Sequence, residues 1–187
     1  RGTAGRRRLL LVSSLVGMRL DLPPPLYRPA PGPLPLAVDL RLQGEGAREA
    51  RVTWGEILQA AVRQEPGADG TRRLTHLAVR LGSGPAPDLP PAGIHVQGNL
   101  ATLPLGEWAG LIKTEETGSP TLPVEMDLTI GSLNTLGQDF AKVRLWGQRD
   151  PIAWRVSVDS ERMAGAITIP RDPAVSPLTL NLQRLWL

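Results

Sequence analysis

The chain has 187 residues, with 20 glycines, 19 prolines, no cysteine, and 21 basic against 18 acidic side chains. A chain of this length can bury its own hydrophobic core. The absence of cysteine excludes disulfides, thiolate metal sites and cysteine nucleophiles. The pI near 10.1 reflects the use of arginine, because the net charge is only +3. Aromatic residues are 4% and the one dense basic run is Arg6-Arg7-Arg8, so we expect no nucleic-acid partner.

The two ends of the sequence resemble cuts through a longer protein. The chain opens on Arg1 rather than Met, and residues 9–12 are too short an apolar run for a signal peptide or a membrane span. It stops on the apolar run Leu185-Trp186-Leu187. We therefore expect an excised fragment of a longer protein, with anything that concerns anchoring outside it.

A proline-rich connector precedes a series of predicted strands. Pro23-Pro24-Pro25 and the stretch 29–35 are too stiff for the centre of a sheet. Apolar and polar residues then alternate strictly, which predicts strands with one apolar face at 36–42, 77–81 and 94–100. A short helix is predicted next, with Pro104 at its first position and Gly118 beyond its end. The alternation returns at 124–130, 143–145, 154–158 and 178–182.

Short turn signals separate these strands, which favours antiparallel meanders. They occur at 44–46, 66–70, 82–84, 149–151 and 171–173. The strands at 36–40 and 124–128 open two halves with the same polarity pattern, which suggests a degenerate repeat. We predict a mostly β fold, with antiparallel meanders forming a strongly curved, groove-like sheet and one short helix. Two groove units are expected, at residues 7–113 and 122–187.

One short helix cannot cover the apolar face of so many strands, so that face must cover itself or a ligand. A sandwich, a closed barrel and an open trough with a lipid-like guest would each solve this problem. The same side chains would form a dry core in the first two cases. In the third they would line a groove suited to acyl chains, and these candidate lining residues are Leu36, Val38, Leu40, Leu42, Leu77, Val79, Leu81, Ile94, Val96, Val124, Met126, Leu128, Ile130, Val143, Leu145, Val156, Val158, Leu178, Leu180 and Leu182.

Catalytic constellations are missing from the sequence. His76 and His95 are the only histidines, and both fall on the polar phase of predicted strands, where we expect them to face solvent. Ser13-Ser14 lacks a nucleophile elbow, and the glycines at 82 and 84 lead into Pro85 rather than into a helix. The carboxylate pairs at 115–116 and at 159 and 161 lie in polar turns. We therefore expect no enzyme, no cofactor and no metal.

Several strings, in order and spacing, resemble the YhdP branch of the AsmA-like superfamily from about residue 9 to the end. The first is Gly17-Met18-Arg19-Leu20-Asp21-Leu22-Pro23-Pro24-Pro25-Leu26, and the second is the stretch 92–100 running into Leu103-Pro104-Leu105 and Trp108. The last third adds the stretches 128–133, 136–137, 164–165, 169–170 and 182–185, with Trp154. Tyr27 and Arg28 stand where glycine and lysine would be expected.

The resemblance implies a large protein anchored in the inner membrane by an N-terminal helix and extending through the periplasm. It implies repeating β-groove units that carry phospholipids toward the outer membrane, with acyl chains in the groove and no nucleic acid or cofactor. This chain would be an interior or C-terminal-region segment, near membranes only through parts outside it. The competing hypothesis is a periplasmic β-scaffold or interaction domain whose edges recruit partners. A hydrolase with an unrecognised site is a third.

Overall fold

The computed structural model describes residues 7–27, 32–42, 46–67, 69–111, 122–135, 137–172, 174 and 176–186. The described part is almost entirely strand. The elements are β1 (Arg7–Ser13), β2 (Leu36–Leu42), β3 (Arg48–Trp54), β4 (Leu58–Pro66), β5 (Arg72–Leu81), β6 (Gly93–Pro104), α1 (Leu105–Leu111), β7 (Val124–Thr135), β8 (Gln138–Arg149), β9 (Ala153–Asp159), β10 (Met163–Pro170) and β11 (Thr179–Leu185).

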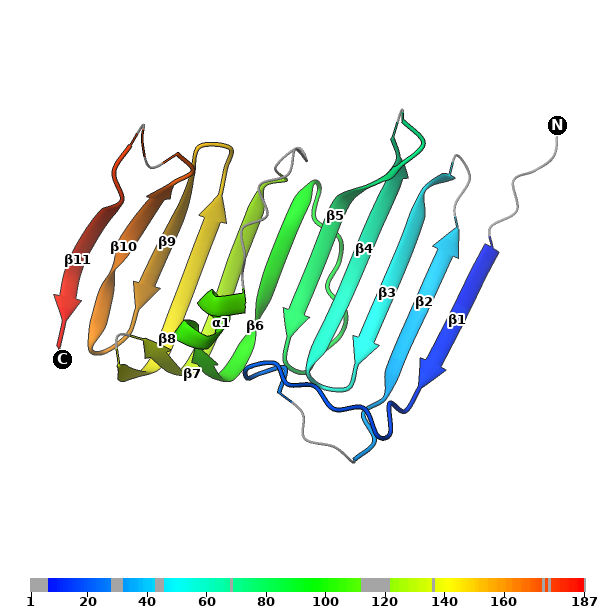
Figure 1. The fold of residues 1–187 in the computed structure, drawn as a ribbon, viewed down its shortest axis with the longest axis horizontal. Helices are drawn as coiled ribbons and strands as arrows, with labels where there is room; N and C mark the ends of the chain where they lie inside the picture. Colours follow the sequence, from blue (N-terminus) through cyan, green and yellow to red (C-terminus); the bar gives the residue numbers. More distant parts are fainter. Residues whose placement is uncertain are drawn as a thin grey trace. The chain divides into compact units, whose positions relative to one another are not determined.

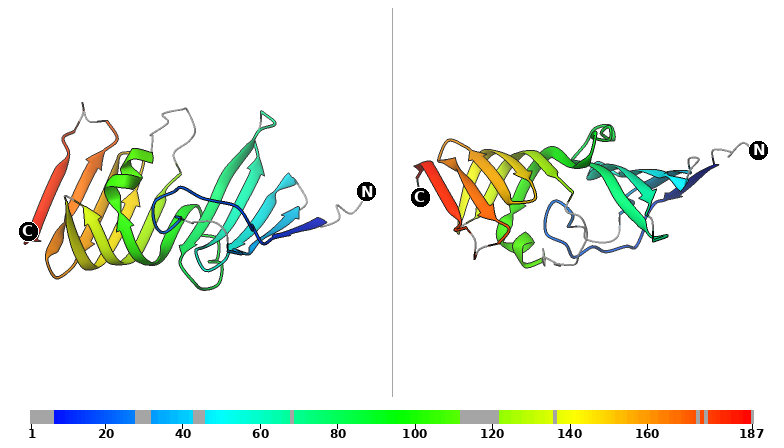
Figure 2. Two further views of the ribbon diagram at one scale, coloured as in Figure 1. Left: turned by 60° about the horizontal axis from the view of Figure 1, so that its bottom comes forward. Right: turned by 90° about the horizontal axis from the view of Figure 1, so that it is seen from above.

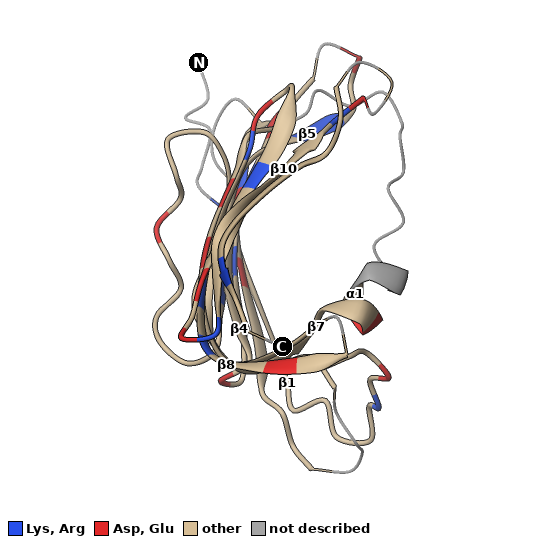
Figure 3. Ribbon diagram, turned by 90° about the vertical axis from the view of Figure 1, so that its left-hand side faces the viewer, with Lys and Arg blue, Asp and Glu red and all other residues tan. Residues whose placement is uncertain are grey.

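The strands follow one another in the sheet in chain order, from β1 to β11, with no crossover. This order follows from the short turns, because consecutive antiparallel strands can be joined by a few residues. Figures 1 and 2 show neighbouring strands running in alternating directions. The sheet is not closed into a barrel, and its strands are bowed along their length in the end-on view of Figure 3. The predicted curved, mostly β sheet is confirmed.

The chain forms two compact units, which divide within β6. Unit 1 comprises Arg1–Leu20 and Pro29–His95, and unit 2 comprises Asp21–Arg28 and Val96–Leu187. The proline-rich connector thus contributes residues to both. The proposed groove-unit boundaries at 7–113 and 122–187 stay a prediction.

In unit 1, the segment 82–92 between β5 and β6 lies along the polar phase of β5 (Figure 1). The Arg80 Nε donates to the Pro85 carbonyl over 3.0 Å, and the His76 Nε2 lies 2.8 Å from the Pro91 carbonyl oxygen. Pro87 is buried. His76 is half-buried on the polar face, as its phase predicts, and its ring also contacts this segment. Its ring helps to hold the segment along the strand.

In unit 2, β7 and β8 form a long hairpin whose alternation changes phase part of the way along. Ile130 pairs with Val143, and Leu133 pairs with Phe140, and all four side chains are at most 1% exposed. The two pairs are three residues apart, and in a regular strand that spacing would place them on opposite faces. Lys142 adopts a φ of 52° between them, which interrupts the extended backbone and changes the direction of the following side chains.

The helix α1 confirms the predicted helix as far as the described residues extend. It starts directly after Pro104, which ends β6, and it lies against β7 on the concave side of the strands (Figures 1 and 3). The Trp108 Nε1 donates to the Pro24 carbonyl over 2.8 Å, which fastens the connector of unit 2 to the helix. Gly118, expected beyond the end of this helix, lies outside the described residues.

The predicted strands at 36–42, 77–81, 94–100, 124–130, 143–145 and 154–158 all lie within observed strands. The strand predicted at 178–182 is confirmed from Thr179. Four strands, β1, β3, β4 and β10, were not predicted. Their alternation is diluted by alanine, glycine and arginine, as in the β4 sequence LQAAVRQEP.

The phase change in the β7–β8 hairpin predicts that Phe140 contributes strongly to stability. Replacing Phe140 with alanine empties a fully buried site, so we expect the free energy of unfolding to fall by about 3–5 kcal/mol in denaturant titrations. Trp146→Ala on the same strand is the control, because Trp146 is 43% exposed and should cost far less. Equal losses in the two variants would contradict the assigned phase.

Candidate functional site

Strand register gathers the apolar side chains of unit 1 into rows that run across five strands. Each row takes one residue from each of β1 to β5, all on the same face of the sheet. We call these rows the apolar face of unit 1. They are Leu9, Leu40, Ala50, Val62 and Leu77; then Leu11, Val38, Val52, Ala60 and Val79; then Ser13, Leu36, Trp54, Leu58 and Leu81.

The apolar face of unit 1 is partly exposed, although Ala60 on it is buried. The leucines and valines of β2 and β5 on this face are only half-buried, and Leu9 and Leu11 are exposed. On the opposite face, Ala61 is 2% and Ala78 0% exposed, because they lie where the segment 82–92 runs along β5. Within the described residues of unit 1, no second layer of strands or helices is available to cover the apolar side. A ligand can therefore reach it.

Unit 2 has a matching apolar face, but its depth varies along the strands. Its rows are Val124, Arg149, Trp154 and Ile169; then Met126, Gly147, Val156, Ile167 and Leu180; then Leu128, Leu145, Val158, Gly165 and Leu182. The side chains of β7 and β8 near the middle of the hairpin are buried, and they are Leu128, Ile130, Val143 and Leu145. The β9 valines are half-buried and the β11 leucines are exposed.

Two glycines in these rows allow larger neighbours to approach the sheet. A Cβ at Gly147 would lie 2.9 Å from the Met126 Cε, and a Cβ at Gly165 would lie 2.5 Å from the Asn181 carbonyl oxygen. Real side chains do not make contacts this short. A side chain at Gly165 would collide with the backbone of β11, and one at Gly147 would displace the end of the Met126 side chain. The glycines thus shape the surface that Met126 and Leu182 present.

The register brings most of the predicted lining residues together within their own unit. Leu36, Val38, Leu40, Leu77, Val79 and Leu81 share the face of unit 1, with Leu42 in the next row; Val124, Met126, Leu128, Ile130, Val143, Leu145, Val156, Val158, Leu180 and Leu182 share that of unit 2. Ile94 and Val96 are half-buried on β6, and Leu178 is 60% exposed just before β11. Their role as a lining stays a prediction.

Sequence reasoning missed several members of both faces. In unit 1, Val52, Trp54, Leu58 and Val62 complete the rows. The alternation of Ala50, Val52 and Trp54 was a usable signal, weakened by the small first member. In unit 2, Leu133 and Phe140 were missed because strict alternation predicts them on the polar face. The positive φ of Lys142, which causes the change of face, is not indicated by the residue type at that position.

The polar phase carries ion pairs that link neighbouring strands. Arg8 and Arg41 both bond to Asp39 in unit 1, with the Arg8 Nε 2.7 Å from Oδ1, and Arg144 pairs with Asp127 in unit 2 at 3.0 Å. The hydrogen bond from Arg8 is the main cause that lowers the pKa of Asp39. Each of these exposed pairs contributes little to stability. Because charged side chains are costly to bury, the pairs favour exposure of this face to solvent.

No arrangement of the described residues resembles a catalytic or metal centre. No group of three or more His, Asp or Glu side chains could hold a metal there. Backbone N–H groups of Ala153 and Ile152 lower the pKa of Asp150, which serves the turn before β9. Among the described helices, none has the length and hydrophobicity needed to cross a membrane.

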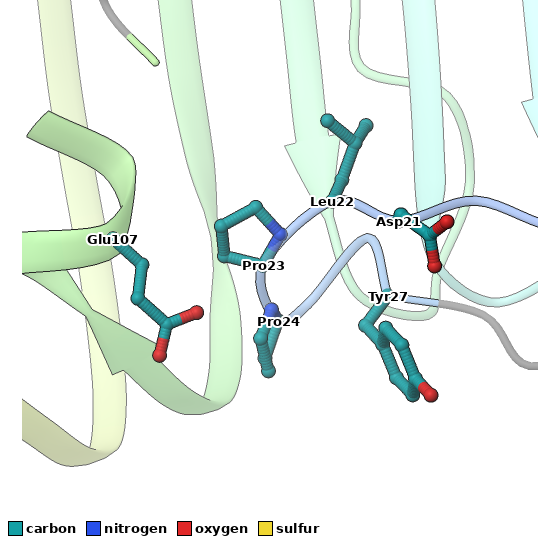
Figure 4. Close-up of a pocket in the computed structure, with 6 residues that line it drawn as sticks. All are labelled: Asp21, Leu22, Pro23, Pro24, Tyr27 and Glu107. Carbon is teal, nitrogen blue, oxygen red and sulfur yellow. The ribbon is translucent and has the colours of Figure 1, made fainter. Parts of the chain in front are cut away.

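An open pocket lies beside α1 in unit 2 (Figure 4). Leu22, Pro23 and Pro24 of the connector form one side of it, and the Glu107 carboxylate approaches from the helix. Asp21 and Tyr27 complete the lining. The hydrogen bond from Trp108 to the Pro24 carbonyl holds the connector against the helix, and the pocket lies where the two meet.

The lowered pKa of Asp39 predicts a pH dependence of stability. Because the pKa in the folded protein lies below the ordinary value of 3.8, the stabilisation is present above that value and is lost as the pH falls through the folded pKa. Asp39→Asn removes it. We expect the difference in melting temperature between wild type and variant to be largest at neutral pH and to shrink below pH 3.8.

The control for this measurement is Asp88→Asn, which changes an exposed carboxylate in the segment 82–92. Its melting temperature should follow that of the wild type across the same range. A constant difference between wild type and Asp39→Asn at every pH would contradict the role given to the ion pair.

A comparison with protein families gives one match that covers nearly the whole chain. The family model described as YhdP protein matches residues 4–187. Comparisons with curated proteins and with solved structures give no match.

Proposed function

The chain belongs to the YhdP family, and from this premise we propose that it is one segment of a bridge-like protein that carries phospholipids from the inner to the outer membrane. Membership supports, in general terms, a place among the AsmA-like, bridge-like lipid transport proteins. The finer proposal adds the cargo, the direct role of this segment and the route. In this proposal the acyl chains lie on the apolar faces of the two units.

The observation that supports the proposal most is the openness of the apolar face of unit 1. Its leucines and valines on β2 to β5 are only partly buried, and Leu9 and Leu11 on β1 are exposed. Exposed apolar area of this kind is unfavourable in water unless something covers it. An acyl chain gains about 0.8 kcal/mol for each methylene that it buries.

The chemistry of the face suits movement along it as well as binding. The three rows of unit 1 contain one hydroxyl, Ser13, and the indole of Trp54, and otherwise aliphatic groups. Aliphatic contacts have no direction, so one position of an acyl chain differs little in energy from the next. A ligand held by many directed hydrogen bonds would be fixed in one place.

The proposed location is the periplasm, with the longer protein anchored in the inner membrane by a part outside this chain. The absence of cysteine is compatible with that compartment. The proposed partners are phospholipid acyl chains, and membranes only through other parts of the protein. We propose no nucleic-acid partner, no cofactor and no enzymatic activity.

The alternative is a structural scaffold without lipid conduction. It is favoured by the two outer strands, β1 and β11, which each pair on one side only and expose leucines. An unpaired edge is a surface on which another strand can pair. A scaffold would use the edge strands but not the apolar face. A substitution on the apolar face should therefore impair lipid conduction and leave a scaffold function intact.

Placing a charge on the apolar face should abolish lipid binding. We propose to incubate the purified chain with vesicles of phosphatidylethanolamine and phosphatidylglycerol and to measure co-purifying lipid by mass spectrometry. Val52 lies in the central row, so Val52→Asp should lower the recovered lipid about tenfold or more, because acyl chains would contact an ionised carboxylate.

The matched control is Thr53→Asp, on the same strand but exposed on the opposite face. It should recover lipid as the wild type does, and far-UV circular dichroism should show both variants folded. Equal lipid recovery from Val52→Asp and the wild type would contradict conduction along this face and would favour the scaffold.

A further inference from the structure

Arginines occur on the apolar phase of both units, and only at one end of the rows. In unit 1 the row that follows Leu9, Leu40, Ala50, Val62 and Leu77 consists of Arg7, Leu42, Arg48, Gln64 and Leu74. Arg72 follows on the same face of β5, paired with Pro66. The opposite end of the face carries Ser13, Leu36, Trp54, Leu58 and Leu81 and no charge. We call Arg7, Arg48 and Arg72 the arginine edge of unit 1.

Unit 2 repeats this arrangement independently with Arg149. It lies in the first row, between Val124 and Trp154, whereas the following rows hold no charged residue. Its guanidinium carbon lies 5.3 Å from the centre of the Trp154 ring, and its Nη2 donates to the Leu122 carbonyl over 3.1 Å. These two contacts hold the guanidinium in one place on the face.

Arg48 and Arg149 have no described carboxylate partner. The same is true of Arg51 and Arg80 on the polar face, whereas other arginines of that face pair with Asp or Glu. Within the described part of the chain, Arg8, Arg41, Arg63, Arg144 and Arg184 each pair with Asp or Glu. Arg48 and Arg149 are half-buried, and no ion pair joins either to a described carboxylate. Among the described residues, Arg72 donates to the Gly46 carbonyl and pairs with no carboxylate, and the buried Nε of Arg149 has no described partner.

A half-buried guanidinium without an anion is unfavourable next to apolar side chains, and a phosphate would satisfy it. From this geometry we propose that the arginine edge of unit 1 and Arg149 of unit 2 bind the phosphate of a phospholipid headgroup. The acyl chains then extend from the arginines across the apolar rows. This inference rests on the proposed function. It adds that the headgroup lies at the arginine end of each apolar face.

The dimensions of unit 1 agree with this orientation. Rows are two residues apart, or about 6.7 Å, so the last apolar row lies about 20 Å from the arginine row along the strand. A single membrane leaflet has a hydrocarbon depth of about 15 Å. A membrane-derived acyl chain that starts at the arginines therefore fits on the apolar rows.

The test compares two probes that share their acyl chains and differ in the phosphate. Phosphatidylglycerol and diacylglycerol, each with the same fluorescent acyl label, are presented to the full chain in neutral maltoside micelles. We expect wild type to bind phosphatidylglycerol more tightly. Arg48→Gln and Arg149→Gln should each weaken that binding about tenfold and leave diacylglycerol binding unchanged, because a charge-assisted hydrogen bond is lost.

Matched controls lie on the same strands and the opposite face. Arg51→Gln on β3 and Arg144→Gln on β8 should bind both probes as the wild type does. Arg149→Lys keeps the charge and should retain part of the preference for the phospholipid. If Arg149→Gln fails to fold, Arg48→Gln in the other unit decides the outcome.

The outcomes separate this inference from the function on which it rests. If wild type binds both probes equally and Arg48→Gln changes neither, the arginine edge is not a phosphate site, although the face binds lipid. If Arg48→Gln weakens both probes equally, the inference is also overturned. If wild type binds neither probe, the proposed lipid function itself is contradicted, and the inference falls with it.

Discussion

An apolar sheet face in unit 1, over which no described strand or helix packs, is the constraint on which the rest of this structure depends. In most proteins a one-sided sheet packs against another sheet or a layer of helices. Here consecutive strands pair in chain order, and the one described helix, α1, lies against β7. The leucines and valines of unit 1 consequently remain half-exposed. The fold presents apolar area in a form that a chain-like ligand can cover.

The two faces of the sheet are stabilised by different interactions. The polar phase is tied across strands by arginine–carboxylate pairs, and in unit 1 the segment 82–92 covers its small residues through His76 and Arg80. The rows of the apolar face carry no charge except at one end, where Arg48 and Arg149 are located. In unit 2 the buried pairs around Phe140 supply a conventional core.

The sequence was sufficient to predict the fold class and the phase of most strands, because alternation is set by the strand geometry itself. It did not predict β3 or β4, where alanine and arginine dilute the pattern. Phe140 was assigned to no face, because the backbone at Lys142 changes the phase without a glycine or proline to mark it. The contact of His76 with the segment 82–92 was not predicted, because the course of that segment depends on tertiary contacts. The arginine edge could be recognised only after the register had aligned Arg48 with the apolar rows.

The most direct test of the central claim is a photo-crosslinking map of the apolar face. A phospholipid with a diazirine in its acyl chain is bound to the purified chain and irradiated, and the labelled peptides are sequenced by mass spectrometry. The account predicts adducts on apolar-phase residues of β2 to β5, such as Leu40 and Val79, and none on Ala61 or Ala78 of the opposite face. Equal labelling of both faces, or labelling confined to the segment 82–92, would contradict it.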